Sequence, residues 1–349
     1  MFSPTKEKVF MGQNLIWVMI LLGQIHGYKS CIQKERMALL EIKKHMIAVA
    51  KEGESNFVFP TWTNDTKSDC CRWEEVKCNR SSGRVTVISF GLMYMKESSL
   101  LNLSLLHPFE DVRILDLGWN RFSGLFDAVE GNKSLSRLRK LEILFLDLNE
   151  FSSSIFPFLN AATSLTKLSL KANNMDGPVP VKELRDLTNL EVLDMSWNRF
   201  NDSIPVQESF PLRNLRALSL RNNNFSSSMG LQGKFAHIFH ISRICKLKNL
   251  QELDLSGNKL VGHFPLCLTN LTRLRVLDLS SNQLTGSIPS SLSNLESLEY
   301  LSLLDNNFEG FFSFGSLTKL SMLRVFKIQL VPTFSYQNLL IICFSWICQ

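Results

Sequence analysis

Between Val112 and Phe308 the apolar residues recur in one arrangement, with leucine-like residues at positions 1, 4, 6 and 11 and an asparagine at position 9. Clear copies are LQELDLSGNKL at 250–260 and LRVLDLSSNQL at 274–284. Most successive asparagines lie 24 or 25 residues apart, and the eight of them are Asn120, Asn149, Asn173, Asn198, Asn223, Asn258, Asn282 and Asn306. A fixed period of this length predicts a solenoid, in which each repeat packs against the next.

The positions within one repeat predict how that repeat folds. Leu277 and Leu279 alternate with polar residues, so they point inward from a short strand, and the strands of successive repeats pair side by side. Asn282 then turns the chain, and its amide satisfies backbone groups that the turn leaves unpaired. The convex return places further apolar residues in the core: Ile288, Leu292 and Leu295. We therefore predict an α/β solenoid, a leucine-rich-repeat horseshoe with a concave parallel β-sheet.

The residues ahead of the repeats predict a leader and a cap. Lys6 and Lys8 precede an apolar run at 15–22, which is typical of a signal peptide over 1–27, with Met1 or Met11 as its start. Residues 28–84 do not repeat, and they are expected to form an N-terminal cysteine-bearing cap over the first repeat. An amphipathic helix is predicted over 35–46, with inward positions Met37, Leu39, Leu40, Ile42 and Met46.

The repeats are expected to occupy 85–330, beginning with a strand over 84–90. The intervals from Asn120 to Asn149 and from Asn223 to Asn258 are longer than the others, which predicts inserted segments. After Asn306 the pattern decays: residues 320–330 keep the leucine spacing but have Ile328 where asparagine belongs. The apolar tail at 331–349 contains no clear C-terminal cap and is too short to span a membrane. It either covers the edge of the last repeat or leaves it open.

Cysteines and sequons agree with the secretory pathway. Cys245 and Cys267 fall in equivalent convex regions of neighbouring repeats, where a disulfide and two buried thiols are both compatible with the sequence. No pairing is predicted for Cys343 and Cys348. Seven Asn-x-Ser/Thr sequons are candidate glycosylation sites: Asn64, Asn79, Asn102, Asn132, Asn201, Asn224 and Asn270.

The sequence gives little support for an enzyme or a nucleic-acid-binding protein. The net charge of +6 is spread along the chain, and no basic block is interleaved with aromatic residues, so nucleic acid is not an expected partner. The pair His237 and His240 has metal-like spacing but no carboxylate or cysteine at the usual offset. We find no phosphate-binding loop or nucleophile motif and predict no catalytic residue, cofactor or metal.

Recognition of another molecule therefore remains as the function. The concave face is expected to present the side chains between the inward leucines and before each asparagine. Trp119 and Trp197 would be favoured interface anchors there, and the alternative is that each packs on its neighbour. The candidate ligand-facing residues are Trp119, Lys171, Asp194, Trp197, Arg221, Asp254 and Asp278.

Two motifs make the resemblance specific. The segment LDLSSNQLTGSIPSSLSNL contains the Gly-x-Ile-Pro turn that marks the plant extracellular type of leucine-rich repeat. The cluster CysCys-x-Trp-x-x-Val-x-Cys at 70–78 resembles the N-terminal cap of the same proteins. From Cys31 to about Leu330 the chain resembles plant leucine-rich-repeat receptor-like proteins, cell-surface receptors without a kinase. The resemblance implies the disulfides Cys31–Cys70 and Cys71–Cys78.

The resemblance also implies partners, but the chain departs from the pattern of the family. An extracellular peptide, protein or glycan ligand in defence or development is expected, together with a leucine-rich-repeat receptor kinase as co-receptor. Receptor-like proteins carry more repeats and a membrane helix, so this chain looks like a truncated N-terminal part of one. Two alternatives stay open: a soluble inhibitor of cell-wall-degrading enzymes, similar to polygalacturonase-inhibiting proteins, and a non-functional truncated relative.

Overall fold

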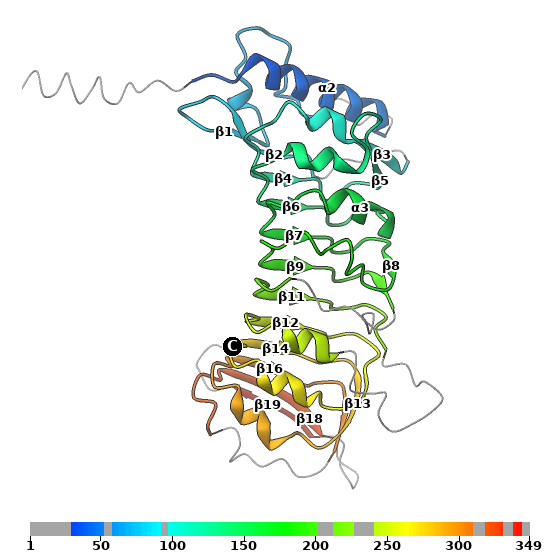
Figure 1. Ribbon diagram of the computed structural model, residues 1–349, viewed down its shortest axis with the longest axis vertical. Helices are drawn as coiled ribbons and strands as arrows, with labels where there is room; N and C mark the ends of the chain where they lie inside the picture. The colour runs from blue at the N-terminus through cyan, green and yellow to red at the C-terminus, as the bar shows by residue number, and fades with distance from the viewer. Residues whose placement is uncertain are drawn as a thin grey trace, which may run out of the picture.

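The computed structural model describes residues 29–51, 58–91, 97–201, 212–226, 241–309, 318–330 and 338–343. They form an elongated stack of short strands, with one long helix lying across the N-terminal end (Figure 1). The expected signal peptide, the pair His237 and His240, and Cys348 lie outside the described residues. The fold class predicted from the sequence is confirmed.

The N-terminal cap is built on helix α2 (Gln33–Val49). Leu39, Ile42 and Met46 are buried against the first strands, as predicted, but Met37 is 44% exposed. Met37 precedes Leu39 by two residues, which is more than half a turn, so it lies on the opposite side of the helix. The prediction that Met37 points inward was therefore wrong, while the helix itself is confirmed.

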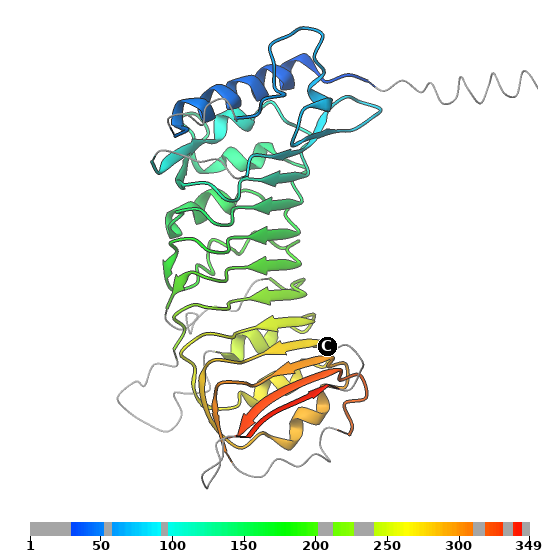
Figure 2. The ribbon, with the colours of Figure 1, turned by 180° about the vertical axis from the view of Figure 1, so that it is seen from behind.

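The main sheet runs along one side of the stack (Figures 1 and 2). It opens with the antiparallel pair β1 (Val76–Cys78) and β2 (Val85–Ser89), and parallel strands follow in chain order. These are β4 (Ile114–Asp116), β6 (Ile143–Phe145), β7 (Lys167–Ser169), β9 (Val192–Asp194), β11 (Ala217–Ser219), β12 (Glu252–Asp254), β14 (Val276–Asp278), β16 (Tyr300–Ser302) and β18 (Val325–Leu330). Among the described residues the sheet ends with β19 (Asn338–Cys343), antiparallel to β18.

The register places equivalent residues of successive repeats side by side. Leu253, Leu277 and Leu301 are direct neighbours in β12, β14 and β16, and each is fully buried. Each buried leucine contributes about 2 kcal/mol of hydrophobic stabilisation. A single repeat has no partner for these side chains, so the free energy of folding comes from stacking.

The opposite side of the stack returns the chain through short elements. The α- and 3-10 helices there are η3 (Leu103–Leu106), η4 (Gly131–Arg137), η5 (Ser153–Ile155), α3 (Phe156–Leu159), η7 (Ile241–Lys246), η8 (Leu266–Asn270) and η9 (Ser290–Asn294). The chain also forms short parallel pairings outside the main sheet: β3 (Ser99–Asn102) with β5 (Phe122–Phe126), β8 (Asp176–Gly177) with β10 (Arg199–Phe200), and β13 (Val261–His263) with β15 (Gln283–Gly286) and β17 (Asn307–Phe308). A further helix, η2 (Cys70–Arg72), lies in the cap. The longer interval after Asn120 is accommodated around η4.

The C-terminal repeat has a different register from the one predicted from the sequence. Phe326 pairs with Leu301, so Ile328 is equivalent to the inward Leu303, and it is buried. The prediction that Ile328 replaces the turn asparagine was wrong by three residues, because the apolar residues of this segment fill the leucine positions in either register. Strand β18 runs on to Leu330 and pairs over six residues with β19. The tail segment therefore covers the edge of this repeat.

Candidate functional site

The turn after each strand is fixed by the repeated asparagine. The Asn282 Nδ2 donates to the carbonyls of Leu255 and Leu279, both at 3.0 Å, and its Oδ1 accepts from the Leu260 N–H at 3.1 Å. Two of these partners belong to the preceding repeat, so the buried amide joins neighbouring turns. The predicted asparagine ladder is confirmed, and it holds the following side chains at one edge of the sheet.

The residue before each asparagine has a left-handed backbone conformation. Its φ lies between 50° and 65° in all eight copies, namely Trp119, Leu148, Ala172, Trp197, Asn222, Gly257, Ser281 and Asp305. Seven of the eight are not glycine, although this conformation is unfavourable for L-residues. We call these eight residues the turn row. Its first four members are apolar and its last four are polar or glycine.

Two tryptophans dominate the exposed surface of the turn row. Trp119 is 59% exposed and Trp197 is 52% exposed. They stand three strands apart, with Leu148 and Ala172 between them. Since sheet strands are about 4.8 Å apart, the separation of the two positions is roughly 14 Å. Exposed aromatic groups at this spacing match an extended ligand better than one compact side chain.

The candidate aspartates have a local structural role. The Oδ1 atoms of Asp194, Asp254 and Asp278 each accept a hydrogen bond at 2.9 Å from the N–H two residues later. Burial raises the pKa of Asp254, and the neighbouring Asp278 carboxylate acts in the same direction. These carboxylates close the turn after the strand, so their regular recurrence does not require a ligand.

The two basic candidates differ in their surroundings. Lys171 and Arg221 are both exposed, and each lies one position before the turn row. The backbone N–H of Trp197 donates to the Arg221 carbonyl at 2.8 Å, which places these two residues on adjacent repeats. Arg221 also lowers the pKa of Asp254 electrostatically, against the larger effect of burial. Trp197, Arg221 and Asp254 therefore lie close together, whereas Trp119 is three repeats away from Trp197.

A polar groove at the opposite ends of the same strands was missed by the sequence reasoning. Asn189, Asn214 and Asn249 each precede the first leucine of a repeat, and each Nδ2 donates to a carbonyl of the preceding repeat. Two hollows of about 480 and 280 Å³ share Glu191 and Asn214 in their lining. The recurring Asn-Leu pairs in the sequence were the available signal.

A Ser–His–Asp cluster on the return side was also missed. The His107 Nε2 lies 2.8 Å from Asp127 Oδ2 and 3.0 Å from Ser134 Oγ, and this hydroxyl donates to Asp127 at 2.8 Å. Burial acts to raise the pKa of Asp127, but hydrogen bonds from the Glu130 and Val129 N–H groups and from Ser134 lower it overall. Serine and carboxylate contact the same imidazole nitrogen, so the arrangement lacks the relay of a hydrolase triad.

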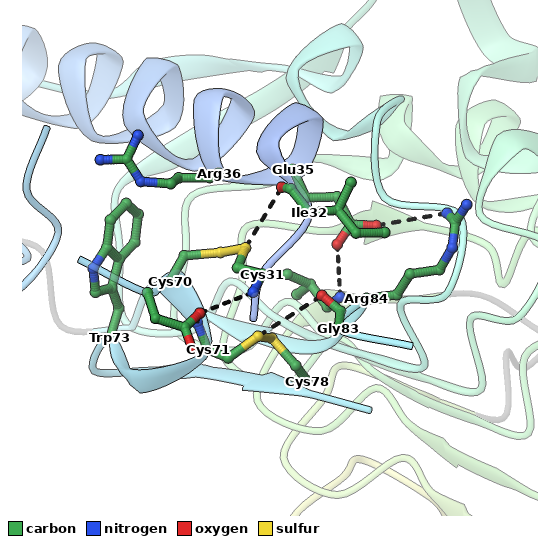
Figure 3. The surroundings of a disulfide bond; sticks show 12 residues. Cys31, Ile32, Glu35, Arg36, Cys70, Cys71, Trp73, Cys78, Gly83 and Arg84 are labelled. Atoms are coloured by element: carbon green, nitrogen blue, oxygen red, sulfur yellow. Dashed lines mark hydrogen bonds and ion pairs between the residues drawn. A yellow bond between two sulfur atoms is a disulfide. The ribbon is translucent and has the colours of Figure 1, made fainter. Parts of the chain in front are cut away.

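The cap contains two disulfides in the arrangement that the resemblance implied (Figure 3). Cys31 pairs with Cys70 and Cys71 with Cys78, each with Cα atoms 5.4 Å apart. Above them, the Glu35 carboxylate accepts a hydrogen bond from the Val85 N–H at 2.7 Å, which ties α2 to β2. A third disulfide joins Cys245 in η7 to Cys267 in η8.

The sequons lie away from the main strands. Asn64, Asn79, Asn132, Asn201 and Asn270 are exposed, whereas Asn102 and Asn224 are half-buried. The side-chain Oδ1 atoms of Asn79 and Asn102 accept local hydrogen bonds from Ser81 and Ser104, respectively. Ser203, which completes the Asn201 sequon, is outside the described residues. Glycosylation at these positions remains a prediction.

Neither a metal-binding cluster nor a membrane-spanning helix is present within the described ranges. They contain no group of three or more His, Cys, Asp or Glu side chains arranged to hold a metal ion. The same ranges hold no helix whose length and apolar character would carry it across a bilayer.

Comparison with known families agrees with the geometry. The leucine rich repeat N-terminal domain matches residues 32–79, and leucine rich repeats match residues 186–204 and 248–308. These matches cover the disulfide-bonded cap and two parts of the strand stack. The fold and its cap therefore define a leucine-rich repeat protein with its N-terminal domain.

Individual relatives define the kind of leucine-rich repeat protein more closely. Receptor-like protein 15 of Arabidopsis thaliana is 74% identical over 324 residues, which are 92% of this chain and 33% of that protein. Putative receptor-like protein 8 of the same plant is 56% identical over 322 residues, which are 92% of this chain and 31% of that protein. In sequence the chain is therefore similar to the leucine-rich repeat receptor-like proteins of plants. It spans about a third of the length of these relatives.

Solved structures show the same architecture. The Arabidopsis receptor kinase HAESA, in complex with the peptide hormone IDA and the co-receptor SERK1, matches with a TM-score of 0.66 and 25% identity. The match covers 84% of this chain and 45% of HAESA. The structure of PEPR1–AtPEP1 matches with a TM-score of 0.56 at 24% identity, which supports the fold alone.

Proposed function

We propose that this chain is the recognition part of a cell-surface or extracellular receptor-like protein, and that it binds an extended peptide along the turn row. The observation that carries the proposal is the exposure of Trp119 and Trp197 on one edge of the sheet. Aromatic side chains supply much of the binding free energy in protein interfaces. The apolar Leu148 and Ala172 continue the surface between them.

The charges next to the turn row suit the ends of such a ligand. Lys171 lies beside the apolar half, and Arg221 lies beside Trp197 near Asp254. An extended peptide that crosses from Trp119 to Trp197 would bring its polar groups to these side chains. HAESA, which shares the fold, is a receptor kinase seen with a peptide hormone and a co-receptor. By analogy, a leucine-rich repeat co-receptor would join the complex.

The test uses the secreted full chain and a displayed library of unmodified linear peptides. Peptides retained by the wild type are measured against Trp119→Ala, Trp197→Ala and the matched control Leu266→Ala, an exposed apolar residue in η8. We expect each tryptophan variant to weaken binding at least ten-fold, or about 1.4 kcal/mol, and the control to leave it unchanged.

Two results would overturn the proposal. Failure of the wild type to retain any peptide would remove the ligand class, and equal binding by the tryptophan variants would remove the site. Retention of a cell-wall-degrading glycosidase in a parallel pull-down, with no peptide retained, would favour the inhibitor alternative. Cytosolic retention of a tagged chain without glycans in plant tissue would contradict the extracellular location.

A further inference from the structure

We propose that the polar groove at the beginning of the strands binds a linear oligosaccharide. We define this groove as the surface between Lys140 and Arg273, which the two adjoining hollows form together. It lies at the opposite strand ends from the turn row, so it is a separate site. The inference does not rest on the proposed peptide function.

The groove presents hydrogen-bond acceptors whose orientation is fixed. Asn189 Nδ2 donates to the Thr163 carbonyl at 3.0 Å, and Asn214 Nδ2 donates to the Thr188 carbonyl at 2.9 Å. One N–H of each amide is used in this way, which fixes the orientation of the group. The Oδ1 atoms remain as acceptors, and no donor among the described residues reaches them. Groups already held in place lose little conformational entropy on binding.

A matching donor lies at one end of the groove. Asn249 Nδ2 donates to the Arg213 carbonyl at 3.0 Å, and its Oδ1 accepts from Arg273 Nη1 at 2.8 Å. The remaining guanidinium N–H groups of the exposed Arg273 are available to a ligand. Gln251 lines the same hollow and adds a second planar amide. The groove therefore presents acceptors along its length and donors at this end.

Most charges in the groove are compensated within the chain. Glu191 lies 3.5 Å from Arg216, and Glu142 lies 2.7 Å from Arg113. Lys140 lies 2.6 Å from Asp111, just outside the lining. Arg139 and Arg273, which also line the hollows, have no carboxylate partner among the described residues, so the groove combines directional hydrogen bonds with only two uncompensated positive charges. This favours a ligand with many hydroxyl groups over a polyanion, because each hydroxyl both donates and accepts.

The spacing and lining also select the ligand class. The asparagines recur once per repeat, so their acceptors are spaced by about 4.8 Å, the strand separation. One sugar of an extended chain is of comparable length. No large apolar side chain lines either hollow, so a peptide would find no pocket for an anchor residue. None of the seven sequon asparagines lines the groove.

The test is calorimetric titration of the secreted full chain, after treatment with an N-glycosidase, with linear oligosaccharides. The probes are neutral β-linked glucan, xylan and mannan oligomers, and free N-glycans released from a glycoprotein form a second arm. Binding to the first arm identifies a polysaccharide source, and binding to the second identifies a glycan on a partner protein. Unmodified linear peptides form a third arm.

The groove variants are Asn214→Ala, Gln251→Ala and Arg273→Ala, and Trp197→Ala on the other edge is the matched control. We expect every groove variant to weaken oligosaccharide binding at least ten-fold and Trp197→Ala to leave it unchanged. Gln251 makes no side-chain hydrogen bond to a described residue, so its variant tests the site even if Asn214→Ala fails to fold.

Three results would overturn the inference. One is no measurable heat with any sugar probe at millimolar concentration. Another is sugar binding that survives the groove variants, and the third is a groove-dependent titration with peptides alone. The proposed peptide function fails separately, because it depends on Trp119 and Trp197 and not on the groove.

Discussion

Trp119 and Trp197 share one backbone conformation, each with a φ of 57°, three repeats apart on the same edge of the sheet. The left-handed region costs an L-residue about 1–2 kcal/mol. The asparagine ladder overcomes this cost, because Asn120 and Asn198 each donate to one carbonyl of their own repeat and to one of the preceding repeat. The indoles are thus fixed on rigid turns, which suits a preformed binding surface.

The turn row makes opposite predictions for two substitutions. Gly257 has a φ of 65° and a Cβ there would meet the Asn222 side chain, so Gly257→Ala should destabilise the fold by about 2 kcal/mol. Ala172→Gly, at a φ of 55°, should stabilise it by roughly 0.5–1 kcal/mol because glycine relieves the strain. Urea unfolding measures both, and a shift of the same sign in the two variants would refute the explanation.

The asparagine ladder should be the most sensitive part of each repeat. Asn282→Ala removes bonds to the Leu255 and Leu279 carbonyls and to the Leu260 N–H, which stay buried. We expect a loss on the order of 3 kcal/mol, since unpartnered buried groups each cost about 1–3 kcal/mol. Hydrogen exchange should show faster exchange in both adjoining repeats. The exposed Asn307→Ala is the control, and an equal effect there would contradict the ladder's role.

The sequence predicted the repeat because its periodicity is a direct consequence of the fold. Leu277, Asn282 and their equivalents must recur wherever a strand pairs and a turn follows. Periodicity failed at the C-terminus, where Leu320, Leu323 and Leu330 fit one register and Leu323, Phe326 and Ile328 fit another. Only strand pairing separates the two. It also failed for Met37. The apolar residues between 35 and 46 extend beyond the buried face of the helix, so their spacing alone does not show that Met37 is exposed.

The recognition surface was predicted only in part. Exposure of Trp119 and Trp197 follows from their position in the repeat. The hydrogen bonds of the aspartates to N–H groups two residues later depend on turn geometry that leucine spacing does not encode. The polar groove depends on side chains from several repeats, so no single repeat displays it. The His107 cluster joins residues from three separate segments.

Loop length predicts an order for the three disulfides. The bridged cysteines are separated by 39 residues for Cys31–Cys70, 22 for Cys245–Cys267 and 7 for Cys71–Cys78. If constraint of the unfolded chain dominates, the double alanine variants should lose stability in that order. The first should lose about 1.5 kcal/mol more than the last. Denaturant titration of the three variants checks this, and a larger loss for Cys71–Cys78 would exclude the chain-entropy explanation.

Glu35 predicts a dependence of stability on pH. Burial raises the pKa of this carboxyl above its usual value of 4.5, and the Val85 N–H and Arg84 oppose the shift without cancelling it. The folded state therefore holds this proton more tightly than the unfolded state. Its contribution to stability is greatest in acid and is lost as pH rises from about 4.5 through the raised pKa. The carboxyls of Glu110 and Asp111 nearby act in the same direction as burial.

Glu35→Gln removes this titration while keeping an oxygen for the Val85 N–H. Its stability relative to wild type should therefore rise across that pH range and stay within about 1 kcal/mol at neutral pH. Glu35→Ala lacks the same titration, so it should lie about 2–3 kcal/mol below Glu35→Gln at every pH, because the buried N–H loses its partner. Glu41→Gln, exposed on the same helix, controls for the loss of one charge. Urea unfolding of the four proteins between pH 4 and pH 8 separates the effects. Parallel curves for wild type and Glu35→Gln would show that the Glu35 carboxyl titrates alike in the folded and unfolded chain.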